Sequence, residues 1–216
     1  MMFVFVPYWN KSTKGFKDSM ANQTLPFDGD LNTNRIIWRN RKRDKIYWTK
    51  AVNDFQKESH RWRGVKDSDV ICVMNNDIEF NENLFREGSR VKQGEVYIPR
   101  GNGVYIIWKL KAFCNWVGRI DGFYGRCFFM TVGDFKKFTF CKLLPHYLSD
   151  LDYSLRVLKK LTPVLMETEI YHKNHERNEG RFILNSGNPI FWTIFLLRHP
   201  NRYTLINILK AWLWWV

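Results

Sequence analysis

The run from residue 69 to residue 80 places the strongest constraint on the fold, because five apolar residues are followed directly by three compact polar ones. A short apolar run of this kind is typical of a strand that is buried on both faces. Open α/β sheets bind ligands just beyond the carboxyl ends of such strands. The oxygens of Asn75, Asn76 and Asp77 could there hold a divalent metal and its phosphates, since hard cations prefer oxygen ligands. Asn and Asp are also ordinary turn residues, so the run alone leaves both interpretations open.

Strand and helix patterns alternate along the rest of the chain, which indicates an α/β fold. Apolar segments predict strands over residues 3–6, 35–38, 95–99, 104–110, 127–132 and 164–171. Helical spacing predicts helices over residues 47–59, 83–91, 134–138 and 151–161, whereas residues 18–34 are predicted to be loop. Ser149 is the expected N-cap of the last of these helices, with Asp152 completing a capping box.

The charge is strongly positive, with 34 Lys or Arg against 21 Asp or Glu, a net of +13. Such a balance implies an acidic partner, which could be nucleic acid, an anionic membrane or a phosphorylated ligand. Residues 35–66 alone carry eleven basic residues and three acids (11 − 3 = +8), interleaved with tryptophans. These are ingredients of nucleic-acid binding, but no recognised binding motif accompanies them, so nucleic acid is the less favoured partner.

Cysteine usage and apolar runs predict a cytoplasmic protein, or one bound peripherally to the cytoplasmic face of a membrane. The spacing of the 4 cysteines fits neither a zinc site nor a disulfide framework. The apolar start, residues 1–6, is too short for a secretory signal. No apolar stretch reaches the roughly 18 residues that a membrane span needs.

Residues 181–216 differ from the rest of the chain, since they contain four Lys or Arg, no acid and many aromatic residues. Bulky apolar residues flanked by Arg198, Arg202 and Lys210 suit helices that lie in a membrane interface. A helical hairpin packed on the domain, or a subunit contact, would explain the same pattern. We therefore predict two units, a domain over residues 1–180 and a carboxy-terminal helical extension that is aromatic and basic over residues 181–216.

Asp150 and Asp152 form a second acidic cluster, for which two interpretations stay open. Acids in the first turn of a helix are stabilised by its dipole, by roughly 0.3–1 kcal/mol when exposed. Asp152 can also pair with Arg156, four residues further on. Alternatively, Asp150 could lie at the mouth of a site and act as a general base toward a substrate hydroxyl.

Four stretches, in the same order, resemble the GT-A glycosyltransferases of family 2, and specifically those similar to rhamnosyltransferases. They are residues 44–53 (DKIYWTKAVN), 69–80 (DVICVMNNDIEF), 122–130 (GFYGRCFFM) and 144–156 (LPHYLSDLDYSLR). The resemblance implies a Rossmann-like, mixed but mostly parallel sheet flanked by helices. It also implies that the amino-terminal strands are incomplete, or that residues 3–10 are the first strand and the second is shortened.

The activity implied by the resemblance is transfer of a sugar, with inversion, from a nucleotide-sugar donor to a hydroxyl of a glycan or a lipid-linked acceptor. Asp77 would bind Mg²⁺ or Mn²⁺, and Asp150 would deprotonate the acceptor. Asn75, Asn76 and Trp48 would line the donor site.

Five further residues would support the site or face the acceptor: His146, Asp152, Arg156, Gly125 and Arg126. His172 or His175 could supply another metal ligand, although a surface histidine is the commoner case. A glycosyltransferase-like scaffold without activity is the remaining alternative.

Overall fold

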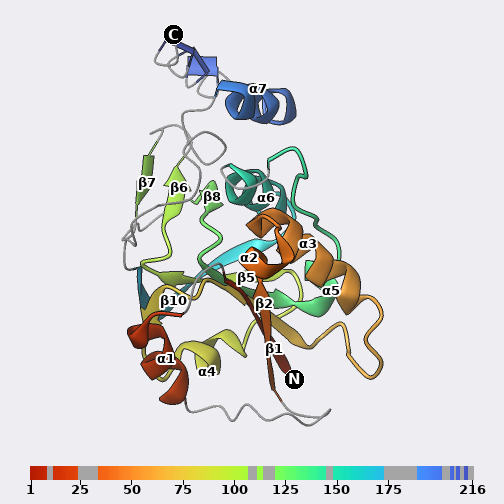
Figure 1. Cartoon of the computed structure of the whole chain (residues 1–216), viewed down its shortest axis with the longest axis vertical. Helices are drawn as coiled ribbons and strands as arrows, with labels where there is room; N and C mark the ends of the chain where they lie inside the picture. The colour runs from red at the N-terminus through yellow and green to blue at the C-terminus, as the bar shows by residue number, and fades with distance from the viewer. Residues whose placement is uncertain are drawn as a thin grey trace.

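The computed structural model describes residues 1–8, 12–23, 34–106, 111–113, 120–144, 148–172, 189–200, 205–206, 208–209 and 212–213. Within these residues, a seven-stranded sheet lies between two layers of helices (Figure 1). The predicted α/β class is therefore confirmed.

Five of the seven strands run in one direction, and β9 and β4 run against them. Across the sheet the order is β2 (Arg35–Asn40), β1 (Met2–Tyr8), β3 (Val70–Met74), β9 (Cys127–Thr131), β5 (Glu95–Arg100), β10 (Thr162–His172) and β4 (Ile78–Phe80). The sheet is mixed, as predicted, with three parallel and three antiparallel pairs of neighbouring strands.

Each face of the sheet is covered by its own helices, which explains why the inner strands are apolar at nearly every position. On one face lie α3 (Trp48–Ser59), α5 (Val132–Phe135) and α6 (Ser149–Val157), packed against Phe3 and Phe5 of β1. On the other face lie α1 (Lys14–Ala21) and α4 (Leu84–Gly88), together with Val4 and Val6. Alternate residues of one strand thus serve two separate cores.

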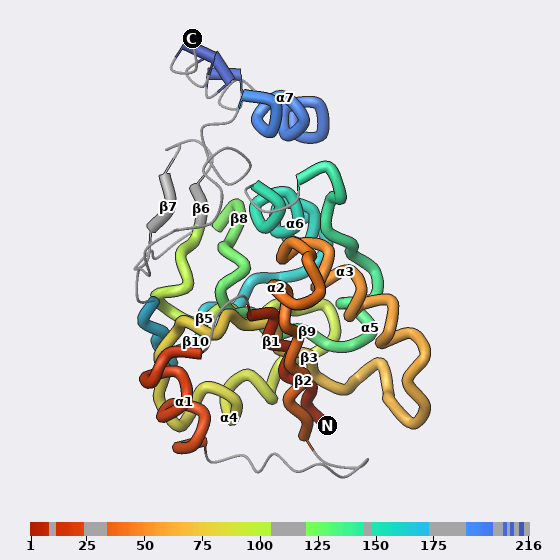
Figure 2. The backbone as a smooth tube through the Cα atoms, viewed as in Figure 1, coloured from red at the N-terminus to blue at the C-terminus, as the bar shows by residue number. Residues whose placement is uncertain are grey.

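Smaller elements complete the described structure. The short helix α2 (Arg41–Asp44) leads into α3, and a second sheet joins β7 (Lys111–Phe113), β6 (Val104–Ile106) and β8 (Gly122–Phe123). Helix α7 (Pro189–Arg198) lies beyond α6, at the end of the molecule opposite the amino terminus (Figure 2). The predicted domain boundary at residue 180 falls outside the described residues.

Strand β1 lies inside the sheet, hydrogen-bonded to β2 on one side and to β3 on the other. Its residues Phe3, Val4 and Phe5 are buried. Residues 2–8 therefore fill the place between β2 and β3, while the incompleteness of the amino-terminal strands stays a prediction.

Two local predictions were wrong. Part of the expected loop over residues 18–34 is helical, since α1 continues to Ala21 from an N-cap at Thr13, whose side chain accepts from the Phe16 amide. Ser149 does not cap α6. Leu148 is the N-cap, and Ser149 is the first, fully buried residue of the helix.

Candidate functional site

Segments far apart in sequence meet where the parallel strands end. Asn75 follows the carboxyl end of β3, and Arg126 precedes the start of the antiparallel neighbour β9. The Asn75 amide donates to the Arg126 carbonyl at 2.8 Å. Trp48 and Asp150 reach the same place from the first turns of α3 and α6. The structure thus brings together five of the residues singled out in the sequence, namely Trp48, Asn75, Gly125, Arg126 and Asp150.

Trp48 is buried and fixes the side chain of Asn75. Its indole Nε1 donates to Asn75 Oδ1 at 3.1 Å, and its ring packs edge-on against Phe140 with centroids 5.0 Å apart. The Asn75 amide oxygen is therefore engaged, which turns the side-chain NH₂ group away from Trp48.

Gly125 joins Asp150 to this pair. Its amide donates to Asp150 Oδ2 at 3.2 Å. A Cβ atom added to Gly125 would lie 2.8 Å from Trp48 Cη2 and 3.4 Å from the Asp150 Cβ atom. Only a residue without a side chain allows the indole, the backbone and the carboxylate to approach this closely.

Asp150 is half-buried, and burial raises the pKa of its carboxyl group. The amides of Gly125 and Leu151, which donate to the two carboxylate oxygens, and the charge of Arg126 oppose that rise. Ionisation of Asp150 is thus disfavoured by its surroundings, which makes the carboxylate a stronger proton acceptor than a solvated one.

The backbone before Asp150 adopts a conformation that the sequence did not reveal. Leu148 has φ 62° and ψ −6°, in the left-handed region, and no side chain caps the helix that it begins. A left-handed conformation is uncommon for a residue other than glycine, and such positions often occur at functional sites. The turn buries Ser149 and leaves Asp150 beside Gly125.

Asp77 lies on the other side of the Asn75–Asn76 turn and pairs with His172 at the end of β10. His172 Nε2 is 3.2 Å from Asp77 Oδ2. The His172 side chain is 16% exposed and so half-buried beside Asp77, and its role as a metal ligand stays a prediction. Within the described chain, Asp77 Oδ1 and His172 Nδ1 are buried and have no hydrogen-bond partner.

These unpartnered atoms fit a metal only in part. Among the described residues, no three His, Cys, Asp or Glu side chains gather closely enough to hold an ion by themselves. Mg²⁺, however, is often held by one or two carboxylates together with substrate phosphates and water. Asp77, with His172 beside it, therefore suits an ion that arrives with a diphosphate.

Asp152 belongs to a different environment. Its carboxylate is fully buried and contacts Arg156, Arg198 and His199. Although burial opposes ionisation, hydrogen bonds from His199 and Arg198 and the charge of Arg156 lower its pKa to about 2. The predicted ion pair with Arg156 is confirmed, but both residues tie α6 to neighbouring segments and to α7.

Arg126 belongs to the loop that leads into β9, and Asn102 contacts that loop. The guanidinium of Arg126 lies over the Tyr124 ring, 5.2 Å from its centroid. Asn102, which sequence reasoning missed, is buried, donates to the Tyr124 carbonyl and accepts from the Cys127 amide. It fixes the loop that carries Gly125 and Arg126. His146 and His175 lie outside the described residues.

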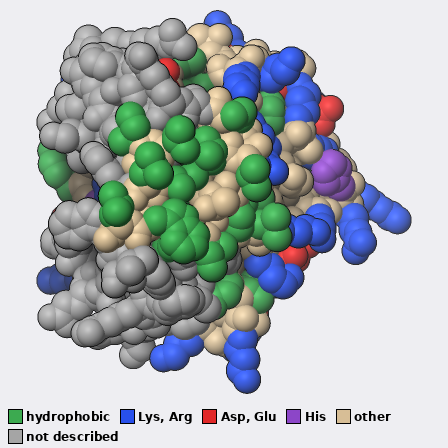
Figure 3. Space-filling model, turned by 90° about the horizontal axis from the view of Figure 1, so that it is seen from above, with side chains coloured by type: hydrophobic (Ala, Val, Ile, Leu, Met, Phe, Trp, Pro, Cys, Tyr) green, Lys and Arg blue, Asp and Glu red, His purple; other side chains and the backbone are tan. Residues whose placement is uncertain are grey.

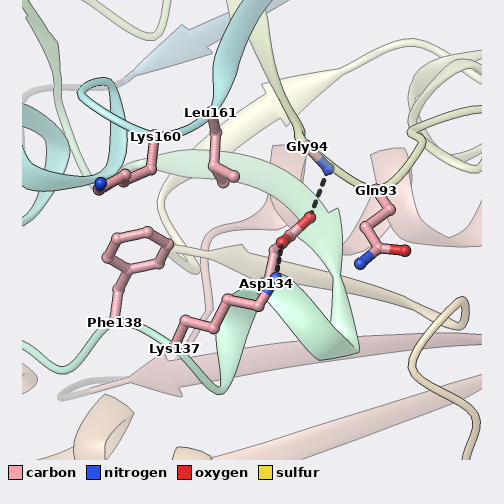
Figure 4. A pocket seen from close by; sticks show the side chains of 7 residues that line it. All are labelled: Gln93, Gly94, Asp134, Lys137, Phe138, Lys160 and Leu161. Atoms are coloured by element: carbon pink, nitrogen blue, oxygen red, sulfur yellow. Dashed lines mark hydrogen bonds and ion pairs between the residues drawn. The ribbon is translucent and has the colours of Figure 1, made fainter.

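A separate hollow lies at the other end of the strands, where β5 and β10 begin (Figure 4). Asp134 is its central acid. It accepts from the Gly94 amide at 2.7 Å and pairs with Lys137 at 2.8 Å. Each carboxylate oxygen of Asp134 has a hydrogen-bond partner, so this acid has a structural role in the hollow.

No family model matches the sequence, and no curated protein matches it. The crystal structure of A197 from STIV is similar over 82% of this chain and 87% of that chain, with 15% sequence identity and a TM-score of 0.45. A similarity of this size carries no argument about fold family or function.

Proposed function

We propose that this protein is an inverting glycosyltransferase of the GT-A fold, which moves a sugar from a nucleotide-sugar donor to a hydroxyl of a glycan or lipid-linked acceptor. One observation carries the proposal. A half-buried carboxylate with a raised pKa, Asp150, is joined through Gly125 to Trp48 and Asn75 at the carboxyl edge of the parallel strands. That edge is where open α/β sheets bind ligands.

Asp150 acts as the general base. It takes the proton of the acceptor hydroxyl while the hydroxyl oxygen forms a bond to the anomeric carbon of the donor sugar. The bond from that carbon to the diphosphate oxygen breaks on the opposite face, so the configuration inverts. Because the amides of Gly125 and Leu151 hold the carboxylate in one orientation, little reorganisation is needed before proton transfer.

The donor diphosphate lies against the turn formed by Asn75, Asn76 and Asp77. Asp77, with His172 beside it, would hold Mg²⁺ or Mn²⁺, and a bound ion would supply Lewis-acid stabilisation of the diphosphate. Arg126 adds positive charge at the same edge. Trp48 acts as a positioning residue, since its indole holds the side chain of Asn75.

Nucleic-acid binding, the alternative drawn from the charge of residues 35–66, gains less support. Base stacking needs exposed aromatic rings. Trp48 is buried in the core, and the Trp62 ring packs against that core, 4.8 Å from the ring of Phe3, which leaves Trp38 and Tyr47 as the exposed aromatic side chains of this segment. Several of the basic side chains also pair with acids, as Arg39 does with Asp44 and Lys50 with Asp54.

Donor binding tests the proposal. Melting temperature is measured with a panel of sugar nucleotides, with and without Mn²⁺, and any donor that raises it is titrated by calorimetry. We expect one donor class to bind only with the metal, and Asp77→Ala to remove that binding.

Asp67→Ala is the matched control, because Asp67 is an exposed acid near the start of β3, whereas Asp77 follows the end of that strand. If no sugar nucleotide raises the melting temperature, the proposal fails in favour of an inactive scaffold. Tight RNA binding without any donor effect would favour the nucleic-acid alternative.

A further inference from the structure

Helix α7 is apolar around its whole circumference. Of its ten residues, only Thr193 and Arg198 are polar. A helix of this kind is normally buried in a protein core or in lipid. Only Pro189 and Phe195 are buried here, whereas Ile190 and Leu197 are exposed, Leu197 by 78%.

The residues after α7 extend this exposed apolar region. We call the whole set the carboxy-terminal apolar surface, formed by Ile190, Leu197, Leu205, Ile206, Leu209, Trp212 and Leu213. Seen from the end of the molecule where α7 lies, hydrophobic side chains gather near the centre and Lys and Arg side chains lie around part of the edge (Figure 3). Clustered exposed apolar residues mark interaction sites more often than isolated ones do.

The buried side of α7 shows that the helix is fixed to the body. Phe195 packs in a small core with Cys141, Leu144 and Leu151. Arg198 and His199, at the end of α7, contact the buried carboxylate of Asp152. The helix therefore presents its remaining apolar side outward as part of a defined surface.

The charge of this region distinguishes between two possible binding partners, a second copy of the chain and an anionic membrane. Residues 181–216 contain four Lys or Arg and no acid, within a chain of net charge +13. A second copy of the chain would bring these like charges together, which is unfavourable. Anionic lipid headgroups would neutralise them, while the acyl region accepts the leucines and Trp212.

The length of α7 determines how it meets a bilayer. Ten residues span about 15 Å, roughly half of the hydrocarbon thickness of a membrane. In the part of the chain that is described, no helix is long and apolar enough to cross a bilayer. The helix suits an orientation parallel to the membrane plane.

We propose that the carboxy-terminal apolar surface docks the protein onto an anionic lipid bilayer, with the apolar side of α7 at the boundary between the headgroups and the acyl chains. Since Asp152 anchors α7 two residues from Asp150, docking holds the candidate site close to the lipid surface. If the proposed function also holds, this placement favours the lipid-linked class of acceptor.

Vesicle flotation tests the docking without any assay of activity. The protein is mixed with vesicles of phosphatidylcholine alone, or of equal parts phosphatidylcholine and phosphatidylglycerol. We expect flotation with the mixed vesicles, weaker flotation with phosphatidylcholine alone, and a decrease as salt screens the charge.

The double variant Leu197→Glu/Leu213→Glu should lose flotation, by roughly tenfold or more in affinity for each leucine that no longer enters the interface. Tyr171→Glu is the matched control, because Tyr171 is 60% exposed on β10, outside the surface, and should float as the wild type does. Circular dichroism verifies that each variant is folded.

Three outcomes would overturn the inference: no flotation with either vesicle, flotation of the double variant equal to that of the wild type, or equal loss in Tyr171→Glu. A wild type that fails to float but dimerises, with a monomeric double variant, would assign the surface to a second copy. None of these results depends on sugar transfer, so failure of the docking and failure of the proposed function are distinguishable.

Discussion

Asp150 and Asp152 share the first turn of α6 but lie in opposite electrostatic environments. Asp150 is half-buried, accepts hydrogen bonds from two backbone amides, and has a raised pKa. Asp152 is fully buried, contacts three basic side chains and has a pKa lowered to about 2. Burial opposes ionisation in both, so the basic partners decide the difference.

This comparison separates a chemical role from a structural one. A carboxylate that takes a proton must not be stabilised too strongly by cations, and the pKa of Asp150 is lowered by hydrogen bonds from backbone amides and by the charge of one cation, Arg126. A carboxylate that anchors a helix is stabilised by nearby cations. Asp152 has two, Arg156 on α6 and Arg198 on α7. The same residue type therefore serves two tasks within one helical turn.

The largest expected effect on the Asp150 side follows from Gly125→Ala. The added methyl group would come within 2.8 Å of Trp48 and 3.4 Å of the Asp150 Cβ atom, so one of them must move. A displacement of about 1 Å can lower a rate by roughly a hundredfold. We expect that loss in turnover together with a lower urea unfolding midpoint, since overpacking of a core typically costs about 1–3 kcal/mol. A variant with normal turnover would show that this close approach is not needed.

On the Asp152 side, the expected effect is on stability. The carboxyl pKa falls from 3.8 to about 2 on folding, which corresponds to about 2 kcal/mol of stabilisation. Because the pKa is lowered, this contribution is complete above pH 3.8 and is lost as the pH falls toward 2.

Asp152→Asn should therefore lower the free energy of unfolding by about 2 kcal/mol at neutral pH, and flatten its pH dependence below pH 4. Urea unfolding of both proteins across this pH range measures the effect. If the stability of Asp152→Asn fell below pH 4 as steeply as that of the wild type, Asp152 would not be the residue that anchors α7 to α6.

A smaller effect is expected from Trp48→Phe, which keeps an aromatic ring against Phe140 but loses the hydrogen bond to Asn75. One hydrogen bond of this kind contributes about 1 kcal/mol. Donor affinity should fall severalfold, as measured by calorimetry, while the structure by circular dichroism is unchanged. If affinity does not change, Trp48 does not position the donor site through Asn75.

Local patterns in the sequence predicted much of the fold and less of the site. The apolar run before Asn75 identified a buried strand, and the spacing of Asp152 and Arg156 identified an ion pair. Contacts between distant residues were not predictable, as between Asp152 and Arg198, 46 positions apart. The left-handed turn at Leu148 was also hidden, because leucine gives no local signal for positive φ.

The hydrogen bond from the Gly125 amide to Asp150 likewise depends on packing between β9 and α6. No single segment of the sequence encodes that packing. The pair of Asp77 and His172 arises because β10 runs beside β4 with His172 opposite Ile78. The pairing of β10 with β4 brings these two side chains together, and the spacing of residues along the sequence does not predict that pairing.

Turnover by Asp150→Asn tests the central claim most directly. Asn can still accept the hydrogen bond from the Gly125 amide but not the one from the Leu151 amide, and it removes a half-buried charge, so folding and donor binding should be retained. The measurement is the rate of nucleoside diphosphate release from the donor that calorimetry identifies, for wild type and variant side by side. We predict that release falls by at least roughly a hundredfold in Asp150→Asn, as loss of a general base requires. Turnover within a factor of two of the wild type, at equal donor affinity, would contradict the claim that Asp150 is the base.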